Sequence, residues 1–129
     1  MQVAMQPFGP AVDWFHGSAI VEVHHGVSGL RIVAAAPHGV DRYLEVHFAF
    51  ANAFQVMDEG DMLDYWAPPY RPDGHLVHEV LEGGWRPRVQ GRLLSITGAH
   101  DGLREWLVST VDLCVSVIAA EAPHVREYG

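Results

Sequence analysis

Hydrophobic and polar residues alternate most regularly between residues 43 and 50. The even positions carry hydrophobic side chains and the odd positions are mostly polar; the hydrophobic residues are Leu44, Val46, Phe48 and Phe50. Successive side chains of a β-strand point to opposite faces of its sheet. This period of two therefore predicts a strand with one buried and one solvent-exposed face.

Other short apolar runs, bounded by glycine, proline or aspartate, are also typical of strands. They cover residues 18–23, 30–36, 53–57, 92–97, 104–109 and 113–119. The first two flank Gly26 and Gly29 and predict a hairpin. Residues 53–57 are expected to continue the strand at 43–50, or to pair beside it, after a break at Asn52. Asp101-Gly102 is a strong hairpin signal.

Two further segments have patterns that also allow a helix. Residues 75–82 place four apolar side chains on one face of a helix, but the run is short and ends in Gly83-Gly84, which suits a strand equally well. Asp61 can cap a single helical turn that reaches Trp66 and stops before Pro68-Pro69.

These elements predict one domain over residues 1–129, with an irregular N-terminal arm at 1–17. The expected fold class is α+β and mostly antiparallel β: a small barrel or curved sheet with one or two short helices. The chain is therefore expected to be β-rich.

The charged residues of the chain exclude several classes of function. The chain has 129 residues, with 16 acidic and 8 basic side chains, so its net charge is −8 with histidine neutral. All the basic residues are arginines, which excludes chemistry that needs a lysine, such as Schiff-base formation or the phosphate contact of a P-loop. The acidic balance also argues against nucleic acid as a partner.

Cysteine content and hydropathy indicate the compartment. Cys114 is the only cysteine, so no intrachain disulfide can form, which suits a reducing cytoplasm. No apolar stretch is long enough to span a membrane, and the first residues do not resemble a signal peptide. We expect a cytoplasmic protein without a membrane partner.

An acidic segment has the pattern Asp58-Glu59-x-Asp61-x-x-Asp64. Carboxylates at this density are found in solvated turns, in Ca²⁺ or Mg²⁺ sites and in patches that bind basic partners. The spacing is not that of an EF-hand, because Pro69 occupies its twelfth position. Nearby aromatic residues extend the candidate partner-binding face: Tyr65, Trp66 and Trp85.

Several histidines suggest an alternative function, the binding of a metal ion. The motif His75-x-x-His78-Glu79, with His47 as a further ligand, can hold a metal ion if the segment is helical. The order is not the His-Glu-x-x-His of a zincin, and in a strand His75 and His78 are expected to face opposite sides. No nucleophile elbow or glycine-rich phosphate loop is present. The sequence predicts no cofactor and no catalytic residue, and favours a non-enzymatic function.

The chain also resembles a group of small uncharacterised bacterial proteins. The resemblance covers roughly residues 43–120 and rests on four stretches: Phe54 with 57–66, 78–85, 105–108 and 114–117. That group is in turn loosely similar to the acidic immunity proteins that neutralise toxins. The resemblance implies a compact β-rich fold and assigns no catalytic residue.

Together these features predict a small acidic protein-binding module, similar to an immunity-type inhibitor, that binds a basic partner protein through 58–66 and Trp85. Two alternatives stay open: a small metal-binding or histidine/carboxylate-dependent enzyme of β-barrel type, and an oligomeric accessory subunit. A homo-oligomer is compatible with each of these.

Overall fold

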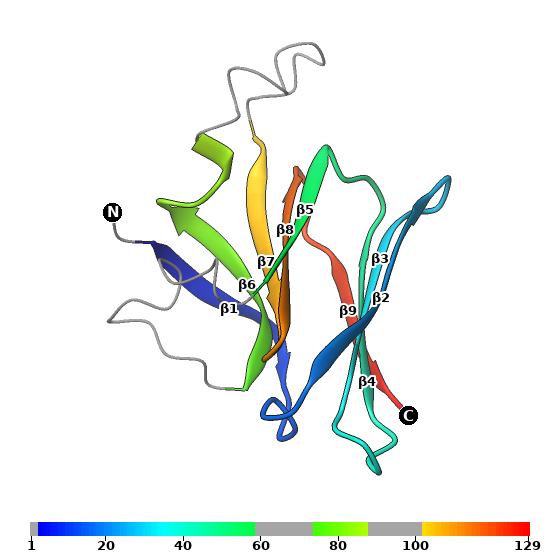
Figure 1. Ribbon diagram of the computed structural model, residues 1–129. Helices are drawn as coiled ribbons and strands as arrows, with labels where there is room; N and C mark the ends of the chain where they lie inside the picture. The colour runs from blue at the N-terminus through cyan, green and yellow to red at the C-terminus, as the bar shows by residue number, and fades with distance from the viewer. Residues whose placement is uncertain (1–2, 59–73, 88–101) are drawn as a thin grey trace.

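The computed structural model describes residues 3–58, 74–87 and 102–129. In these residues the backbone forms two antiparallel sheets that face each other (Figure 1). The five-stranded sheet contains, in spatial order, β1 (Ala4–Ala11), β6 (His75–Glu82), β7 (Arg104–Ser109), β8 (Leu113–Ala119) and β5 (Ala53–Asp58). The four-stranded sheet contains β2 (Ala19–Gly26), β3 (Gly29–Ala35), β4 (Tyr43–Phe48) and β9 (His124–Tyr128).

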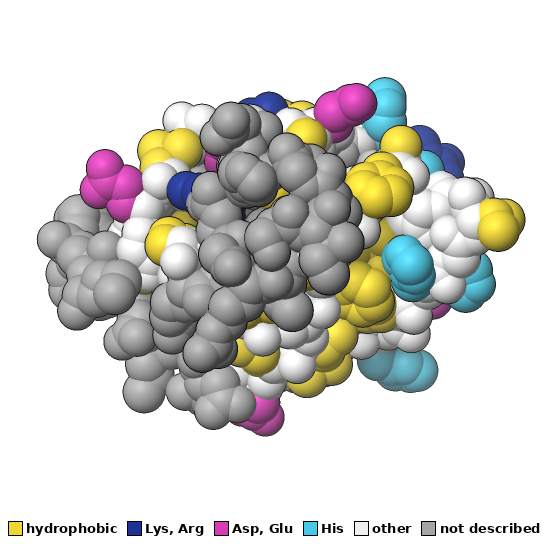
Figure 2. Space-filling view, turned by 90° about the horizontal axis from the view of Figure 1, so that it is seen from above, with side chains coloured by type: hydrophobic (Ala, Val, Ile, Leu, Met, Phe, Trp, Pro, Cys, Tyr) yellow, Lys and Arg dark blue, Asp and Glu magenta, His cyan; other side chains and the backbone are white. Residues whose placement is uncertain are grey.

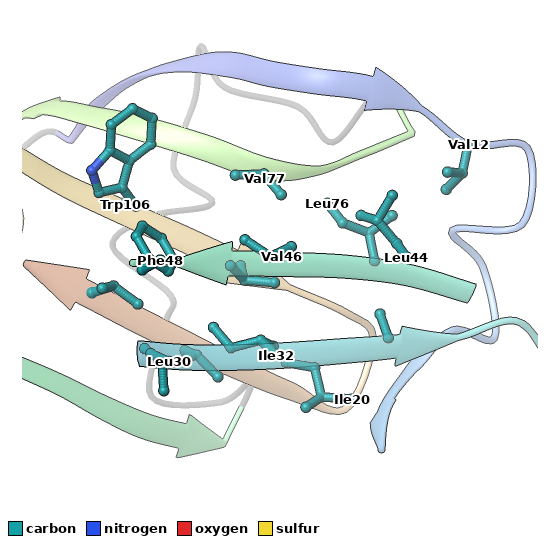
Figure 3. Close-up of a cluster of buried hydrophobic side chains, with 14 of the residues drawn as sticks. Val12, Ile20, Leu30, Ile32, Leu44, Val46, Phe48, Leu76, Val77 and Trp106 are labelled. Carbon is teal, nitrogen blue, oxygen red and sulfur yellow. The ribbon is translucent and has the colours of Figure 1, made fainter. Parts of the chain in front are cut away.

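The main hydrophobic core lies between the two sheets (Figure 3). The four-stranded sheet contributes Ile20, Leu30, Ile32, Leu44, Val46 and Phe48. The five-stranded sheet contributes Leu76, Val77, Trp106, Val108, Val115 and Val117. Side chains from two facing sheets that meet in one core define a β-sandwich.

The alternating pattern at 43–50 is confirmed for the strand that it predicts. In β4 the side chains of Leu44, Val46 and Phe48 are buried, and the residues between them are half-buried. Phe50 lies beyond the end of the strand and is 71% exposed. The hairpin predicted from 18–23 and 30–36 is also confirmed, as β2 and β3.

The expectation that residues 53–57 continue or flank the strand at 43–50 is wrong. They form β5, which crosses to the other sheet and pairs with β8. Asn52 marks the crossing, where its backbone N–H donates to the carbonyl of Ile118 at 2.8 Å. Strand composition identifies a strand but not its partner, because pairing depends on contacts far along the chain.

The irregular N-terminal arm is also corrected, because residues 4–11 form β1. This strand contains Pro7 and Pro10, which the sequence suggested were breaks. Proline has no N–H to donate, so it is tolerated at the edge of a sheet, and β1 is an edge strand. The register of β1 is irregular between Phe8 and Ala11, a stretch that contains Gly9 and Pro10, whereas Pro7 is paired with His78.

The barrel and the short helices were also not found. The pairings divide the described strands into two separate sheets, so no barrel closes. The elements of the described residues are all strands, and the ambiguous segment 75–82 is strand β6. The predicted strand at 92–97 and the helical turn from Asp61 to Trp66 lie outside the described residues.

Strands β7 and β8 are buried on both faces. Inward-facing residues such as Val115 and Val117 join the main core. Residues on the opposite face, which we call the outer face of the five-stranded sheet, join two smaller apolar clusters built on Leu107 with Cys114 and on Leu103 with Ile118. A strand buried on both sides does not alternate, which explains the continuous apolar run at 113–119.

Truncating Trp106 should test the packing between the sheets. Its ring is fully buried, lying 5.1 Å from the ring of Phe8 and 6.4 Å from that of Phe48, centroid to centroid. We expect Trp106→Ala to lower the free energy of unfolding by about 3–5 kcal/mol in urea titrations, with a smaller loss for Trp106→Phe. Val27→Ala, at a fully exposed hairpin tip, should change it by less than about 0.5 kcal/mol. A loss below about 1 kcal/mol for Trp106→Ala would contradict this packing.

Candidate functional site

The predicted partner-binding residues are Asp58, Glu59, Asp61, Asp64, Tyr65, Trp66 and Trp85. The structure describes the first and the last, and the other five lie outside the described residues. Asp58 is the final residue of β5 and is paired with Leu113, the first residue of β8. Asp112 directly precedes Leu113, so β5 brings the start of the acidic segment to an end of the sheet that carries a second carboxylate.

Trp85 is placed against the outer face of the five-stranded sheet. Its side chain is half-buried and packs against the cluster of Leu103 and Ile118. Its backbone N–H donates to the Oε2 atom of Glu105 at 3.0 Å. These contacts give Trp85 a role in covering the sheet, and they do not bring it together with Asp58.

Glu105 is a buried carboxylate that the sequence analysis did not single out. Its carboxylate accepts hydrogen bonds from the backbone N–H groups of Trp85 and, at 2.7 Å, of Arg86. A Cβ atom at Gly84 would lie 2.6 Å from both carboxylate oxygens, so glycine is needed there. A buried carboxylate requires such donors, because burial removes it from water. The sequence contained two indications of this buried carboxylate: a glutamate within a largely apolar strand, and the Gly83-Gly84 pair earlier in the chain.

Other polar groups are buried on the same outer face. The hydroxyls of Ser109 and Ser116 are buried and have no hydrogen-bond partner, so neither is bonded to the fully buried His78. Cys114, paired with Ser109 across the strands, is a buried thiol. A serine needs an adjacent base to act as a nucleophile. Among the described residues, this face therefore shows packing and not an activated serine.

The alternative metal site used His75, His78, Glu79 and His47. The rings of His75 and His78 lie 6.4 Å apart between centroids, although a regular strand would place them on opposite faces. The reason is that Leu76 and Val77 both enter the core (Figure 3), where β6 has an irregular register against β1. The expectation of opposite faces was therefore wrong.

The remaining two candidate ligands lie elsewhere. Glu79 follows His78 and faces the opposite side of β6. His47 is in β4 on the other sheet, where its Nε2 atom donates to the carbonyl of Ser28 at 2.7 Å. The part of the chain that the structure describes contains no group of three metal-ligating side chains.

Glu79 is held in an ion pair. The Nε and Nη2 atoms of Arg104 donate to its two carboxylate oxygens at 2.8 and 3.0 Å. The guanidinium of Arg104 lies 4.6 Å from the ring centroid of Trp106, so the pair also covers one edge of the core. The hydrogen bonds from Arg104 lower the pKa of Glu79 below its ordinary value.

The exposed face of the four-stranded sheet carries a second set of ion pairs. Arg31 contacts both Glu22 and Glu45, and Arg126 contacts Glu45 at 3.3 Å. The hydrogen bond from Arg31 lowers the pKa of Glu45. A row of basic and imidazole side chains crosses this face on four neighbouring strands: His24, Arg31, His47 and His124. Its arginines are thus compensated by glutamates of the same sheet.

A small depression lies at one end of the sandwich, between the connection from β4 to β5 and the connection from β8 to β9. It has a volume of about 120 Å³ and is lined by Ala49, Phe50, Ala120, Glu121, Ala122 and His124. Figure 2 looks onto this end, where hydrophobic side chains are exposed beside histidines. The volume is below the roughly 300 Å³ at which ligand pockets usually begin.

Comparison with known proteins identified no relative: no family model, curated protein or solved structure matches the chain. In the described ranges, no helix has the length and apolar character needed to cross a membrane. The functional inference therefore depends on the residues themselves.

The ion pair of Glu79 should make stability depend on pH. Because its folded pKa is lowered, its stabilising effect is complete above the ordinary pKa of 4.5 and is lost as the pH falls through the folded pKa. Arg104 is partly exposed, so we expect Glu79→Gln to lower the free energy of unfolding by about 1 kcal/mol near pH 7. Urea unfolding should show this difference shrinking toward pH 3.

The control is Glu82→Gln, at the exposed end of the same strand, which should have little effect at either pH. A difference between parent and Glu79→Gln that stayed constant down to pH 3 would show that the carboxylate charge does not provide the stabilisation.

Proposed function

We propose that this chain is a small acidic protein-binding module that binds a basic partner protein, as an immunity-type inhibitor binds a toxin. The proposal assigns the binding to the acidic segment that begins at Asp58. It treats the protein as a bacterial, cytoplasmic, non-enzymatic binder. The reducing compartment is supported by the single cysteine, which is a buried thiol.

One observation carries the proposal: four arginines of the described residues are paired with glutamates of the fold. Arg31, Arg42, Arg104 and Arg126 each form an ion pair. These ion pairs join neighbouring strands, or join β9 to the connection between β3 and β4, so the arginine charges are compensated within the molecule. The net charge of −8 is then available to attract a partner of opposite charge.

The location of Asp58 supports the choice of face. β5 is an edge strand of the five-stranded sheet, and its last residue, Asp58, is paired with Leu113, the residue that follows Asp112. Charges at the margin of an interface mainly accelerate association and weaken in salt. An inhibitor that must find a basic enzyme quickly, such as a nuclease, would benefit from this arrangement.

Neutralising the acidic segment should slow association. The partner would be captured from the native host with the immobilised chain, identified and purified for binding kinetics. We expect the variant Asp58→Asn, Glu59→Gln, Asp61→Asn to associate about tenfold more slowly than the parent at low salt. The two rates should converge at high salt, because salt screens exposed charges.

A matched control removes the same charge elsewhere: Asp41→Asn, Glu82→Gln, Glu121→Gln, all exposed in the structure. Equal slowing by both triple variants would assign the effect to net charge and remove the acidic segment from the interface. Stoichiometric zinc, iron or nickel in protein purified without a histidine tag would favour the metal-binding alternative over this proposal.

A further inference from the structure

Among the strands of the described residues, four lie at sheet edges: β1 and β5 in one sheet, β2 and β9 in the other. An edge strand presents main-chain N–H and C=O groups that can pair with another strand. Proteins usually prevent this with prolines, bulges, charged side chains or short strands. The four edges can therefore be compared by the protection that each one has.

Three of the edges are protected. β1 contains Pro7 and Pro10 and has two register irregularities. It also approaches β9, since a Cβ atom at Gly9 would lie 3.1 Å from the side chain of Val125. β9 has only five residues and includes the charged pair Arg126 and Glu127. β2 has a register irregularity beside Glu22.

β5 has none of these features. Its six residues read Ala-Phe-Gln-Val-Met-Asp, with no proline or glycine and no charge before the terminal Asp58. Its pairing with β8 is regular along the whole strand. A regular, uncharged edge strand of this length is the kind that accepts a further strand.

The side chains of β5 supply an apolar surface beside the edge. Val56 is paired with Val115 and shares its inward face, yet it is 46% exposed. Phe54, two residues earlier, also faces inward and lies 5.6 Å from the ring of His25, centroid to centroid. An added strand would cover Val56 and extend the core beyond its present margin.

We propose that β5 is the docking edge for an extended segment of a partner protein, which adds to the five-stranded sheet as a further antiparallel strand. The inference deepens the proposed function and rests on it for the charge of the partner. Asp58 and Asp112 lie at one end of the edge, so the segment carries basic residues at the end that meets them. A second copy of the chain is disfavoured, because both copies carry a charge of −8.

A synthetic peptide tests the edge directly. The probe has two arginines followed by alternating threonine and valine, Arg-Arg-Thr-Val-Thr-Val-Thr-Val. Hydrogen exchange of the full chain, followed by NMR, should show alternate amides of 53–58 exchanging at least about tenfold more slowly with peptide. Amides that point toward β8 should change little, because they are already hydrogen-bonded. Unchanged exchange along β5 at millimolar peptide would overturn the proposal.

Charged substitutions at Val56 separate strand addition from simple charge attraction. An added strand would bury residue 56, so Val56→Lys and Val56→Glu should each weaken peptide binding at least about tenfold. If charge alone acted, Val56→Glu would bind the basic peptide more tightly, and the proposal would be wrong. The matched control is Val21→Lys, on the edge strand β2 with 58% exposure, which should bind as the parent does. Unfolding curves confirm that each variant is folded.

Two further measurements distinguish the failures. If the captured partner depends on the acidic segment but binds Val56→Lys and Val56→Glu as tightly as the parent, the docking edge is wrong and the proposed function remains. If the peptide docks on β5 but neutralising the acidic segment leaves partner binding unchanged, the acidic segment is not the partner-binding site. The assignment of β5 as a docking edge would then still hold. If sedimentation shows dimers of the parent chain, and Val56→Lys abolishes them, the occupant of the β5 edge would be a second copy of the chain and not a partner protein.

Discussion

The structure depends on one constraint: β7 and β8, the adjacent strands inside the five-stranded sheet, are buried on both faces. The four-stranded sheet covers their inner face, where the ring of Trp106 fills the space between the layers. Their outer face is buried as well, although it carries a carboxylate and hydroxyls. Burial of such groups is costly unless donors accompany them. The connection after β6 therefore folds back to place two N–H groups on Glu105, and Gly84 provides the space.

This arrangement limits where the molecule can meet a partner. Neither face of β7 or β8 is accessible, and the exposed face of the four-stranded sheet has arginines compensated by glutamates. The depression lined by Phe50 has a volume of only about 120 Å³. The edges and ends of the sandwich remain, and they differ in their protection. A surface of this kind suits recognition of a polypeptide, because its edge strands offer main-chain groups.

Local pattern in the sequence was enough to predict β4, the hairpin of β2 and β3, and the strand character of β7 and β8. It was not enough to place β5, because Asn52 allows the chain either to turn back or to cross to the other sheet. The prolines of β1 were misleading, since they exclude a central strand but not an edge strand. The relative position of His75 and His78 depended on two consecutive inward residues, which no period of two predicts. The acidic segment beyond Asp58 was evident from composition, but its neighbour Asp112 became apparent only through the pairing of β5 with β8.

The absence of lysine connects the composition to the edges. Lysine is the residue that most often protects an edge strand, because its long side chain keeps a charge beside the exposed main chain. Here the only basic side chains are arginines, and those of the described sheets are held in cross-strand or loop contacts with glutamates. The residues of β5 itself carry no positive charge that would block an incoming strand. The net charge of −8 instead opposes pairing between two copies, since like charges repel at encounter. Under the proposed docking, this form of protection would be selective: it would disfavour acidic chains, including a second copy of the protein, and leave the same edge open to a segment of opposite charge.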